Sequence, residues 1–214
     1  VDTHAARGIY DLRGDEAQRT GEYRDGVERL LLATDLPTAL ADYVARIRTF
    51  GVDDNGSLVR YPGSPLLARE MLREHDGAIL CEVQPDEAAA LRVALRGDAR
   101  CAVHERDGYA ALKALLPPAQ KRGLVLIDPP FEAQGAEFET IQNALATAFT
   151  RWPNAIYAVW YPIKRRETIV PFHRWLAAHA GNADVLVAEL LLHADNSPLR
   201  LAGCGLAIVN PPWR

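Results

Sequence analysis

Six short apolar runs, separated by stretches with helical periodicity, constrain the fold of this chain more than any other feature. The runs are Ala78–Val83, Ala99–His104, Gly123–Ile127, Ala155–Trp160, Ala183–Leu192 and Gly205–Val209. Near-continuous apolar strands that alternate with helices are typical of a parallel sheet covered on both faces. Only a loop separates the last two runs, which predicts an antiparallel hairpin at one edge. The pattern therefore predicts an α/β fold with a mostly parallel, Rossmann-like sheet whose last strand is antiparallel.

A helical segment interrupts this alternation near the start of the chain. Apolar residues between positions 20 and 50 recur every three or four residues, as on one face of a helix. We predict a small inserted helical subdomain over residues 15–60, and a main domain formed by residues 1–14 and 61–214. Because the chain opens on Val1, in what reads as the end of a strand, we expect a fragment that lacks an amino-terminal segment.

Composition excludes several classes of protein. In 214 residues, 49% hydrophobic residues are enough for a real core, which excludes a disordered chain. The net charge of −4 argues against nucleic-acid binding through bulk positive charge. No apolar run reaches the roughly 18 residues of a membrane helix. Three cysteines without metal-ligand spacing, and the absence of a signal peptide, predict a cytoplasmic protein without a metal. We expect a monomer.

Acidic residues follow four predicted strands in succession. They are Asp2, Glu82, Asp107 and Asp128. The carboxyl ends of parallel strands share one edge of the sheet, where ligands of open α/β folds bind. The glycine fingerprints of dinucleotide and phosphate loops are absent, which disfavours a dinucleotide-dependent oxidoreductase. A nucleoside without phosphates, such as S-adenosylmethionine, suits this edge. Glu82 would accept from the ribose hydroxyls and Asp107 from the adenine amine, and Asp2 or the adjacent backbone would face the methionine amine.

The turn after the apolar run Gly123–Ile127 carries the strongest chemical signal, Asp128-Pro129-Pro130-Phe131. Its two prolines fix the backbone and remove two N–H donors. The Asp128 carboxylate and the Pro129 carbonyl can then accept both hydrogens of an exocyclic amine, which directs the nitrogen lone pair at a methyl group. Phe131 offers a face for stacking a base. A similar tetrapeptide, Asn210-Pro211-Pro212-Trp213, follows the last strand, and we interpret it as a structural turn near the site.

With these motifs, the sequence resembles the RlmJ-type 23S ribosomal RNA adenine-N6 methyltransferases. The matching segments are Asp2–Ala5 with Gly8 and Tyr10, Arg19–Tyr23, Tyr61–Pro65, Glu82 before Pro85, Asp107-Gly108, Leu126–Glu132, Trp160–Pro162 and Val209–Trp213. The resemblance implies a class I methyltransferase fold with a helical insertion, use of S-adenosylmethionine, and methylation of one adenine of 23S rRNA, position 2030 in the family's numbering. It also implies a set of cofactor-binding residues. These are His4, Ser64, Glu82, Asp107 and Gly108, together with Asp128, which is also the acid of the family's catalytic motif.

Two positions depart from the family's pattern. The family's first loop reads His-Ala-Gly-x-Gly, where this chain has Ala6 in place of the first glycine. Alanine resists a positive φ, so we expect this loop to approach the cofactor differently. The family's usual tyrosine is replaced by Phe131, which keeps the stacking face and loses the hydroxyl.

Basic residues cluster after the predicted strand that ends near Trp160. Lys164, Arg165 and Arg166 follow it at the active-site edge, and we predict that they contact rRNA phosphates. A solvated helix start is the alternative interpretation. Methylation of a DNA adenine or of a cytosine N4, and a non-catalytic role in the use of external DNA, remain the alternative functions.

Overall fold

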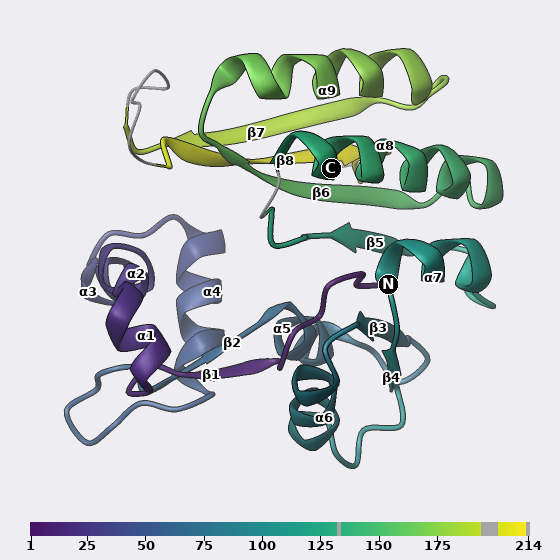
Figure 1. Cartoon of the computed structure of the whole chain (residues 1–214). Helices are drawn as coiled ribbons and strands as arrows, with labels where there is room; N and C mark the ends of the chain where they lie inside the picture. Colours follow the sequence, from purple (N-terminus) through teal and green to yellow (C-terminus); the bar gives the residue numbers. More distant parts are fainter. Residues whose placement is uncertain (132–133, 194–200, 213–214) are drawn as a thin grey trace. The chain divides into compact units, whose positions relative to one another are not determined.

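The chain divides into two compact units in a computed structural model that describes residues 1–131, 134–193 and 201–212. Unit 1 comprises Val1–His4, Ile79–Gln84 and His104–Arg214, and unit 2 comprises Ala5–Ala78 and Pro85–Val103. Strands β3 (Ala78–Glu82) and β4 (Cys101–Glu105) pair with each other, and each has residues in both units. Figure 1 labels the elements and colours them by their position along the sequence.

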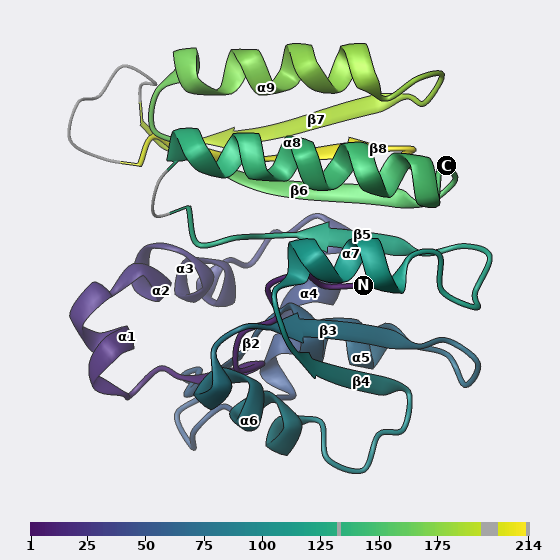
Figure 2. The same cartoon turned by 45° about the vertical axis from the view of Figure 1, so that its right-hand side comes forward.

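Unit 1 contains most of the sheet and the helices on one of its faces. Its elements, besides parts of β3 and β4, are α7 (Gly108–Leu115), β5 (Leu124–Ile127), α8 (Gln134–Arg151), β6 (Ile156–Ile163), α9 (Arg166–His179), β7 (Val185–Leu191) and β8 (Gly203–Val209). Strands β5 and β6 are parallel, and β8 runs antiparallel between β6 and β7 (Figure 2). The six apolar runs thus all form strands, and the predicted hairpin of the last two is confirmed.

The first residues of the chain complete the sheet between β3 and β5. Asp2 bridges Leu80 on one side and Leu126 on the other, both in parallel orientation. The Asp2 N–H donates to the Ile79 carbonyl at 2.8 Å, and the Thr3 N–H to the Leu126 carbonyl at 3.1 Å. The strand order is therefore β4, β3, Val1–Thr3, β5, β6, β8, β7. This is the α/β, Rossmann-like class I methyltransferase sheet that the sequence predicts.

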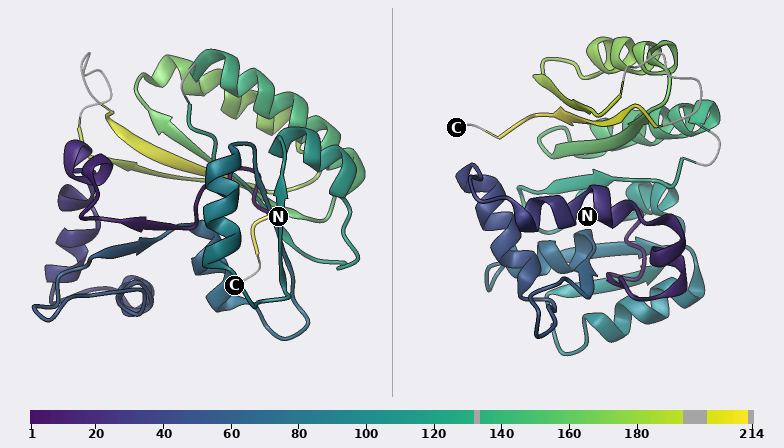
Figure 3. Two further views of the ribbon diagram at one scale, coloured as in Figure 1. Left: turned by 60° about the horizontal axis from the view of Figure 1, so that its bottom comes forward. Right: turned by 90° about the vertical axis from the view of Figure 1, so that its left-hand side faces the viewer.

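Helices α7, α8 and α9 lie against one face of this sheet (Figure 3). Their buried side chains and those of the strands form the apolar core of unit 1. Ile127, Val159 and Ala207 contribute from the strands, while Leu145 and Phe172 contribute from the helices. Full burial of one large apolar side chain stabilises the folded state by roughly 1.5–3 kcal/mol. Both β5 and β6 are therefore covered by this core up to their carboxyl ends, at Ile127 and Ile163.

Unit 2 is built from helices and a small two-stranded antiparallel sheet. Its remaining elements are β1 (Ile9–Asp11), α1 (Asp15–Thr20), α2 (Glu22–Asp25), α3 (Val27–Leu32), α4 (Thr38–Arg48), β2 (Arg60–Pro62), α5 (Ser64–Met71) and α6 (Pro85–Ala94). Strands β1 and β2 pair antiparallel, and helices α1–α4 lie between them along the chain. A small core beside them contains Leu12, Val27, Ile47 and Leu58. Gly21 and Gly26 split the helical segment into short pieces.

Candidate active site at the carboxyl edge of the sheet

Five predicted site residues of unit 1 meet at the carboxyl edge of its strands. Asp2 lies in the first segment and His4 follows it, Glu82 ends β3, Asp107 follows β4, and Asp128 follows β5. Asp2 and Glu82 are buried, at 6% and 8% exposure. The Asp2 carboxylate accepts the His4 N–H at 3.1 Å, and the Glu82 carboxylate accepts the Gln84 N–H at 2.7 Å. These contacts fix the direction of both acidic side chains.

The Asp128-Pro129-Pro130-Phe131 turn directly continues β5. Asp128 keeps access to solvent, yet desolvation by the surrounding protein, followed by the neighbouring Asp2 charge, raises its pKa to about 6. Among the described residues, neither its carboxylate nor the Pro129 carbonyl receives a hydrogen bond. The turn therefore presents acceptors that the rest of the described chain does not use.

Phe131 ends this turn in an unusual conformation. Its φ of 52° is in the left-handed region, and its ring is 3% exposed. The ring packs edge-on against Phe138, with centroids 5.4 Å apart, and against Trp160 at 6.0 Å. In this structure Phe131 thus anchors the turn in the core, and stacking on a base would need its ring to rotate outward.

The imidazole of His4 contacts two neighbouring side chains, those of Thr3 and Tyr109. Its Nδ1 lies 2.8 Å from the Thr3 hydroxyl, and its ring meets the Tyr109 ring edge-on at 4.8 Å. Burial lowers the pKa of His4, although the charges of Glu137, Glu82 and Asp107 act in the opposite direction. The imidazole is therefore neutral at neutral pH, and it lies within the electrostatic reach of three carboxylates.

Asp107 and Gly108 bring helix α7 onto this loop. Asp107 is the N-cap of α7 and accepts the Ala110 N–H at 3.0 Å. A Cβ on Gly108 would lie 1.9 Å from the Thr3 carbonyl oxygen, so no other residue permits this approach. Ser64, the remaining predicted cofactor residue, begins α5 in unit 2, and its role stays a prediction.

The three basic residues after β6 differ in their surroundings. Arg166 makes two hydrogen bonds to the Glu189 carboxylate, at 2.7 and 2.6 Å, and Glu189 also accepts from the Tyr161 hydroxyl at 3.0 Å. Lys164 and Arg165 are exposed and have no acidic partner in the part of the chain that the structure describes. The parallel β5–β6 pairing places both at the same edge as Asp128.

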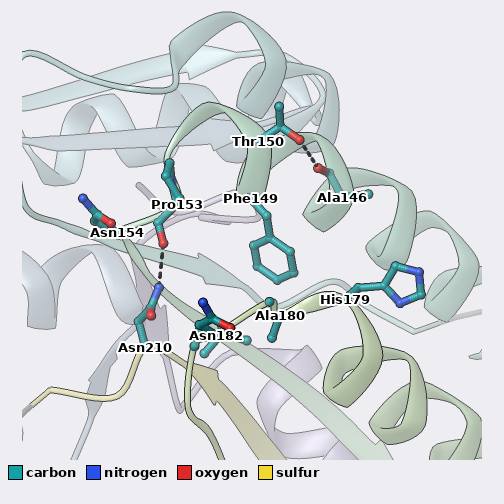
Figure 4. A pocket seen from close by; sticks show the side chains of 12 residues that line it. Ala146, Phe149, Thr150, Pro153, Asn154, His179, Ala180, Asn182 and Asn210 are labelled. Atoms are coloured by element: carbon teal, nitrogen blue, oxygen red, sulfur yellow. Dashed lines mark hydrogen bonds between the residues drawn. The ribbon is translucent and has the colours of Figure 1, made fainter.

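The second Pro-Pro turn lies at the opposite edge of the sheet. Val209 pairs with Tyr157 near the start of β6, so Asn210 follows at the amino edge. Its side-chain amide donates to the carbonyl of Pro153 (Figure 4) and to that of Ala155, both at 2.8 Å. Interpretation as a structural turn agrees with these bonds, but the expectation that it lies near the site is wrong. Trp213 lies outside the described residues, as does Glu132.

A hollow of about 590 Å³ accompanies this turn, between the last turns of α8 and α9. Phe149 faces it together with Asn154, Asn182 and His179 (Figure 4). None of the predicted site residues lines it. We therefore assign the candidate active site to the carboxyl edge and not to this hollow.

Ala6 adopts the conformation that alanine was expected to resist. Its φ is 49°, as a glycine there would readily allow. The backbone strain of a left-handed alanine costs about 1–2 kcal/mol. The loop therefore keeps a glycine-like path without the glycine.

The described residues form neither a metal-binding cluster nor a membrane-spanning helix. In residues 1–131, 134–193 and 201–212, no three His, Cys, Asp or Glu side chains are grouped to hold a metal ion. Over the same ranges, the helices lack the combination of length and apolar character that crossing a membrane requires.

Comparison with known proteins decides the family. The family model described as "RsmJ: Ribosomal RNA large subunit methyltransferase D, RlmJ" matches residues 1–214. The chain belongs to this family. The RlmJ-family relative named ribosomal RNA large subunit methyltransferase J of Escherichia coli (strain K12) is 38% identical over 214 residues. That match covers 100% of this chain and 75% of the relative's length.

Two further matches support membership. A protein of the same name from Haemophilus influenzae is 36% identical over 213 residues, again covering 75% of its length. A crystal structure of protein LPL1258 from Legionella pneumophila has a TM-score of 0.88 and 34% identity, and covers 99% of this chain and 76% of that one. The resemblance drawn from the motifs is confirmed, and the chain is a member of a methyltransferase family.

Three features of this RlmJ-family site escaped the sequence analysis. They are the Thr3 hydroxyl beside His4, the Tyr109 contact to Glu137, and the Arg166 pair with Glu189. The partners in the last two pairs are 28 and 23 positions apart and lie on different elements. No local pattern signals such pairs, so only the folded chain brings them together.

Proposed function

We propose that this chain transfers a methyl group from S-adenosylmethionine to the exocyclic N6 of an adenine in 23S ribosomal RNA, the adenine numbered 2030 in the family. The names of its relatives support a large-subunit rRNA substrate. The observation that carries the proposal is the pair of unused acceptors, the Asp128 carboxylate and the Pro129 carbonyl, next to the Asp2–His4 loop.

The residues at the carboxyl edge fit this cofactor. Asp2, Glu82, Asp107 and Asp128 present carboxylates, and His4 presents a neutral ring. Such a set favours a ligand that carries positive charge, hydroxyls and amines, as a sulfonium nucleoside does. When bound, the cofactor supplies a methyl group activated by the positive sulfur.

Asp128 and Pro129 would act on the acceptor amine. Two hydrogen bonds from N6 to their oxygens hold the nitrogen in line with the methyl group and turn its lone pair away from the ring. The new N–C bond forms as the C–S bond breaks, and the sulfur keeps the electron pair. The methylated nitrogen then releases a proton, and a carboxyl of pKa about 6 can take it.

Phe131, Lys164 and Arg165 would complete the substrate side. An adenine flipped out of RNA needs a flat contact, which Phe131 provides if its ring leaves the cluster with Phe138 and Trp160. Lys164 and Arg165 would contact phosphates, whereas Arg166 already pairs with Glu189. We therefore confine the proposed RNA contact to the first two basic residues.

The test is a transfer assay with labelled cofactor, followed by mass spectrometry of the nucleosides. The substrates are deproteinised 23S rRNA fragments, single-stranded DNA and duplex DNA. N6-methyladenosine from the rRNA alone supports the proposal. Methylated deoxyadenosine or N4-methylcytidine would replace it with the corresponding alternative. Failure to bind S-adenosylmethionine in titration calorimetry would favour a non-catalytic nucleic-acid-binding protein.

A further inference from the structure

Two residues that no proposed step uses, Tyr109 and Glu137, connect the cofactor side of the site to the Asp128 turn. Tyr109 lies in the first turn of α7, and Glu137 lies in the first turn of α8. The Tyr109 hydroxyl donates to the Glu137 carboxylate at 2.6 Å. Burial, and then Glu137, raise the pKa of Tyr109, so the phenol keeps its proton. This bond joins two helices that follow different strands.

The Tyr109 ring also supports His4. The two rings meet at 68°, with centroids 4.8 Å apart, in an edge-on contact. Gly108 allows this contact, because the close approach of α7 to the Thr3 backbone excludes any side chain there. The position of the imidazole therefore depends on where the Tyr109 ring is held.

The chain of contacts continues from His4 to β5. The Thr3 hydroxyl lies 2.8 Å from His4 Nδ1 and donates to the Leu126 carbonyl at 3.1 Å. A hydroxyl has a single proton, so a Thr3 that donates to Leu126 must accept from the imidazole. His4 then carries its proton on Nδ1, and its Nε2 is an acceptor for a ligand.

The series of contacts from Leu126 to Glu137 begins just before the proposed catalytic turn in the sequence and ends just after it. Leu126 lies two residues before Asp128, and Glu137 lies six residues after Phe131. We propose that Glu137, Tyr109, His4 and Thr3 form a brace that anchors the Asp128–Phe131 turn from both sides, with Tyr109 and Glu137 as positioning residues for methyl transfer. This inference rests on the proposed function, since the turn positions the accepting amine.

Removal of the hydroxyl isolates the brace from the ring contact. In Tyr109→Phe the edge-on contact to His4 remains, and Glu137 loses its donor. We expect kcat to fall about tenfold, with the dissociation constant of S-adenosylmethionine changed less than threefold. Glu137→Gln keeps an acceptor oxygen and should retain kcat within about threefold, whereas Glu137→Ala should match Tyr109→Phe.

The double variant tests whether the two residues act as one unit. Tyr109→Phe combined with Glu137→Ala should be no slower than either single variant, because the second change removes a bond already lost. Tyr43→Phe is the matched control: it removes a half-buried tyrosine hydroxyl that lies 2.6 Å from Tyr61 in unit 2. Wild-type kcat in Tyr109→Phe, or multiplied losses in the double variant, would overturn the proposal.

Two measurements do not depend on activity. Hydrogen exchange at the Asp128 and Phe131 amides should quicken in Tyr109→Phe and Glu137→Ala, and stay unchanged in Glu137→Gln and Tyr43→Phe. Nitrogen chemical shifts of His4, assigned with His4→Gln, should report the Nδ1–H tautomer. Unchanged exchange or the Nε2–H tautomer would overturn the brace. An inactive wild type that shows both expected signatures would overturn the proposed function alone.

Discussion

Asp128-Pro129-Pro130-Phe131 and Asn210-Pro211-Pro212 are turns of nearly the same sequence at opposite edges of one sheet. Each follows a strand, and each contains a residue with positive φ, 52° at Phe131 and 55° at Asn210. They differ in what their polar atoms contact. The Asn210 amide is used by two carbonyls, whereas the Asp128 carboxylate meets no donor among the described residues.

The comparison teaches that the tetrapeptide alone does not define a catalytic motif. The direction of the preceding strand decides which edge the turn reaches, since β8 runs antiparallel to β6. The neighbouring backbone then decides whether the acceptors and donors are satisfied internally. A turn closed by its own chain stabilises the fold, and a turn left open can bind a substrate.

The largest expected effect separates the two turns by activity. Asp128→Ala should lower the rate of methyl transfer by about 10²–10³-fold, as for the loss of one electrostatic stabiliser in other enzymes, with cofactor affinity within a few-fold. Single-turnover kinetics and calorimetry measure the two quantities. Asn210→Ala is the control at the other edge, and it should leave the rate per folded molecule unchanged. An active Asp128→Ala would contradict the assignment.

Stability should show the reverse order. Asn210→Ala removes two hydrogen bonds and places alanine at a φ of 55°, so we expect a loss of about 2–3 kcal/mol in the free energy of unfolding. Urea denaturation measures it. Asn210→Gly tolerates the φ and should lose only the hydrogen-bond part. Equal losses for alanine and glycine would mean that strain contributes nothing.

The pH dependence of the reaction follows from the raised pKa of Asp128. A carboxyl with a pKa of about 6 becomes protonated as the pH falls, and then offers one acceptor fewer. We expect kcat/KM at pH 5 to be about tenfold below its value at pH 7, with the midpoint near pH 6. Asp128→Asn does not titrate, so its residual activity should lack this limb. A midpoint near pH 4 in the wild type would contradict the structure.

The basic residues at the carboxyl edge give a smaller effect. Replacing Lys164 and Arg165 together with alanine should weaken rRNA binding several-fold and flatten its salt dependence, because phosphate contacts release counterions. Arg166→Ala should leave the salt slope unchanged and lower stability, since Glu189 then loses its charged partner and keeps only the Tyr161 hydroxyl. Fluorescence anisotropy over a salt series distinguishes these outcomes. An unchanged slope in the double variant would end the proposed phosphate contact.

Ala6 offers the smallest effect and measures backbone strain by itself. Ala6→Gly removes the strain of a left-handed alanine but gives the unfolded chain more freedom, so a net gain of about 0.5 kcal/mol remains. Thermal unfolding detects it. Gly8→Ala, at a φ of 79° with a Cβ 2.7 Å from the Leu91 side chain, should be clearly destabilising. A destabilised Ala6→Gly would contradict this account.

The sequence predicted the parts of this structure that depend on local pattern. The apolar runs located all six strands, and the acidic residues after them lie at the carboxyl edge that holds the candidate site, because strand direction orders both. Pairings between distant elements carried no such signal. Tyr109 with Glu137 and Arg166 with Glu189 depend on helix placement, and the buried ring of Phe131 depends on a left-handed backbone that its identity disfavours.

Gly108 has a consequence for how the cofactor loop can change. A single methyl group there would collide with the main chain of the segment between β3 and β5, which cannot move without breaking its hydrogen bonds to both neighbours. Position 108 therefore accepts no residue larger than glycine unless the first loop takes a different path, whereas side chains around the site can be changed in small steps. In any sequence of this architecture, the residue after the α7 cap reports whether the first loop follows the same path.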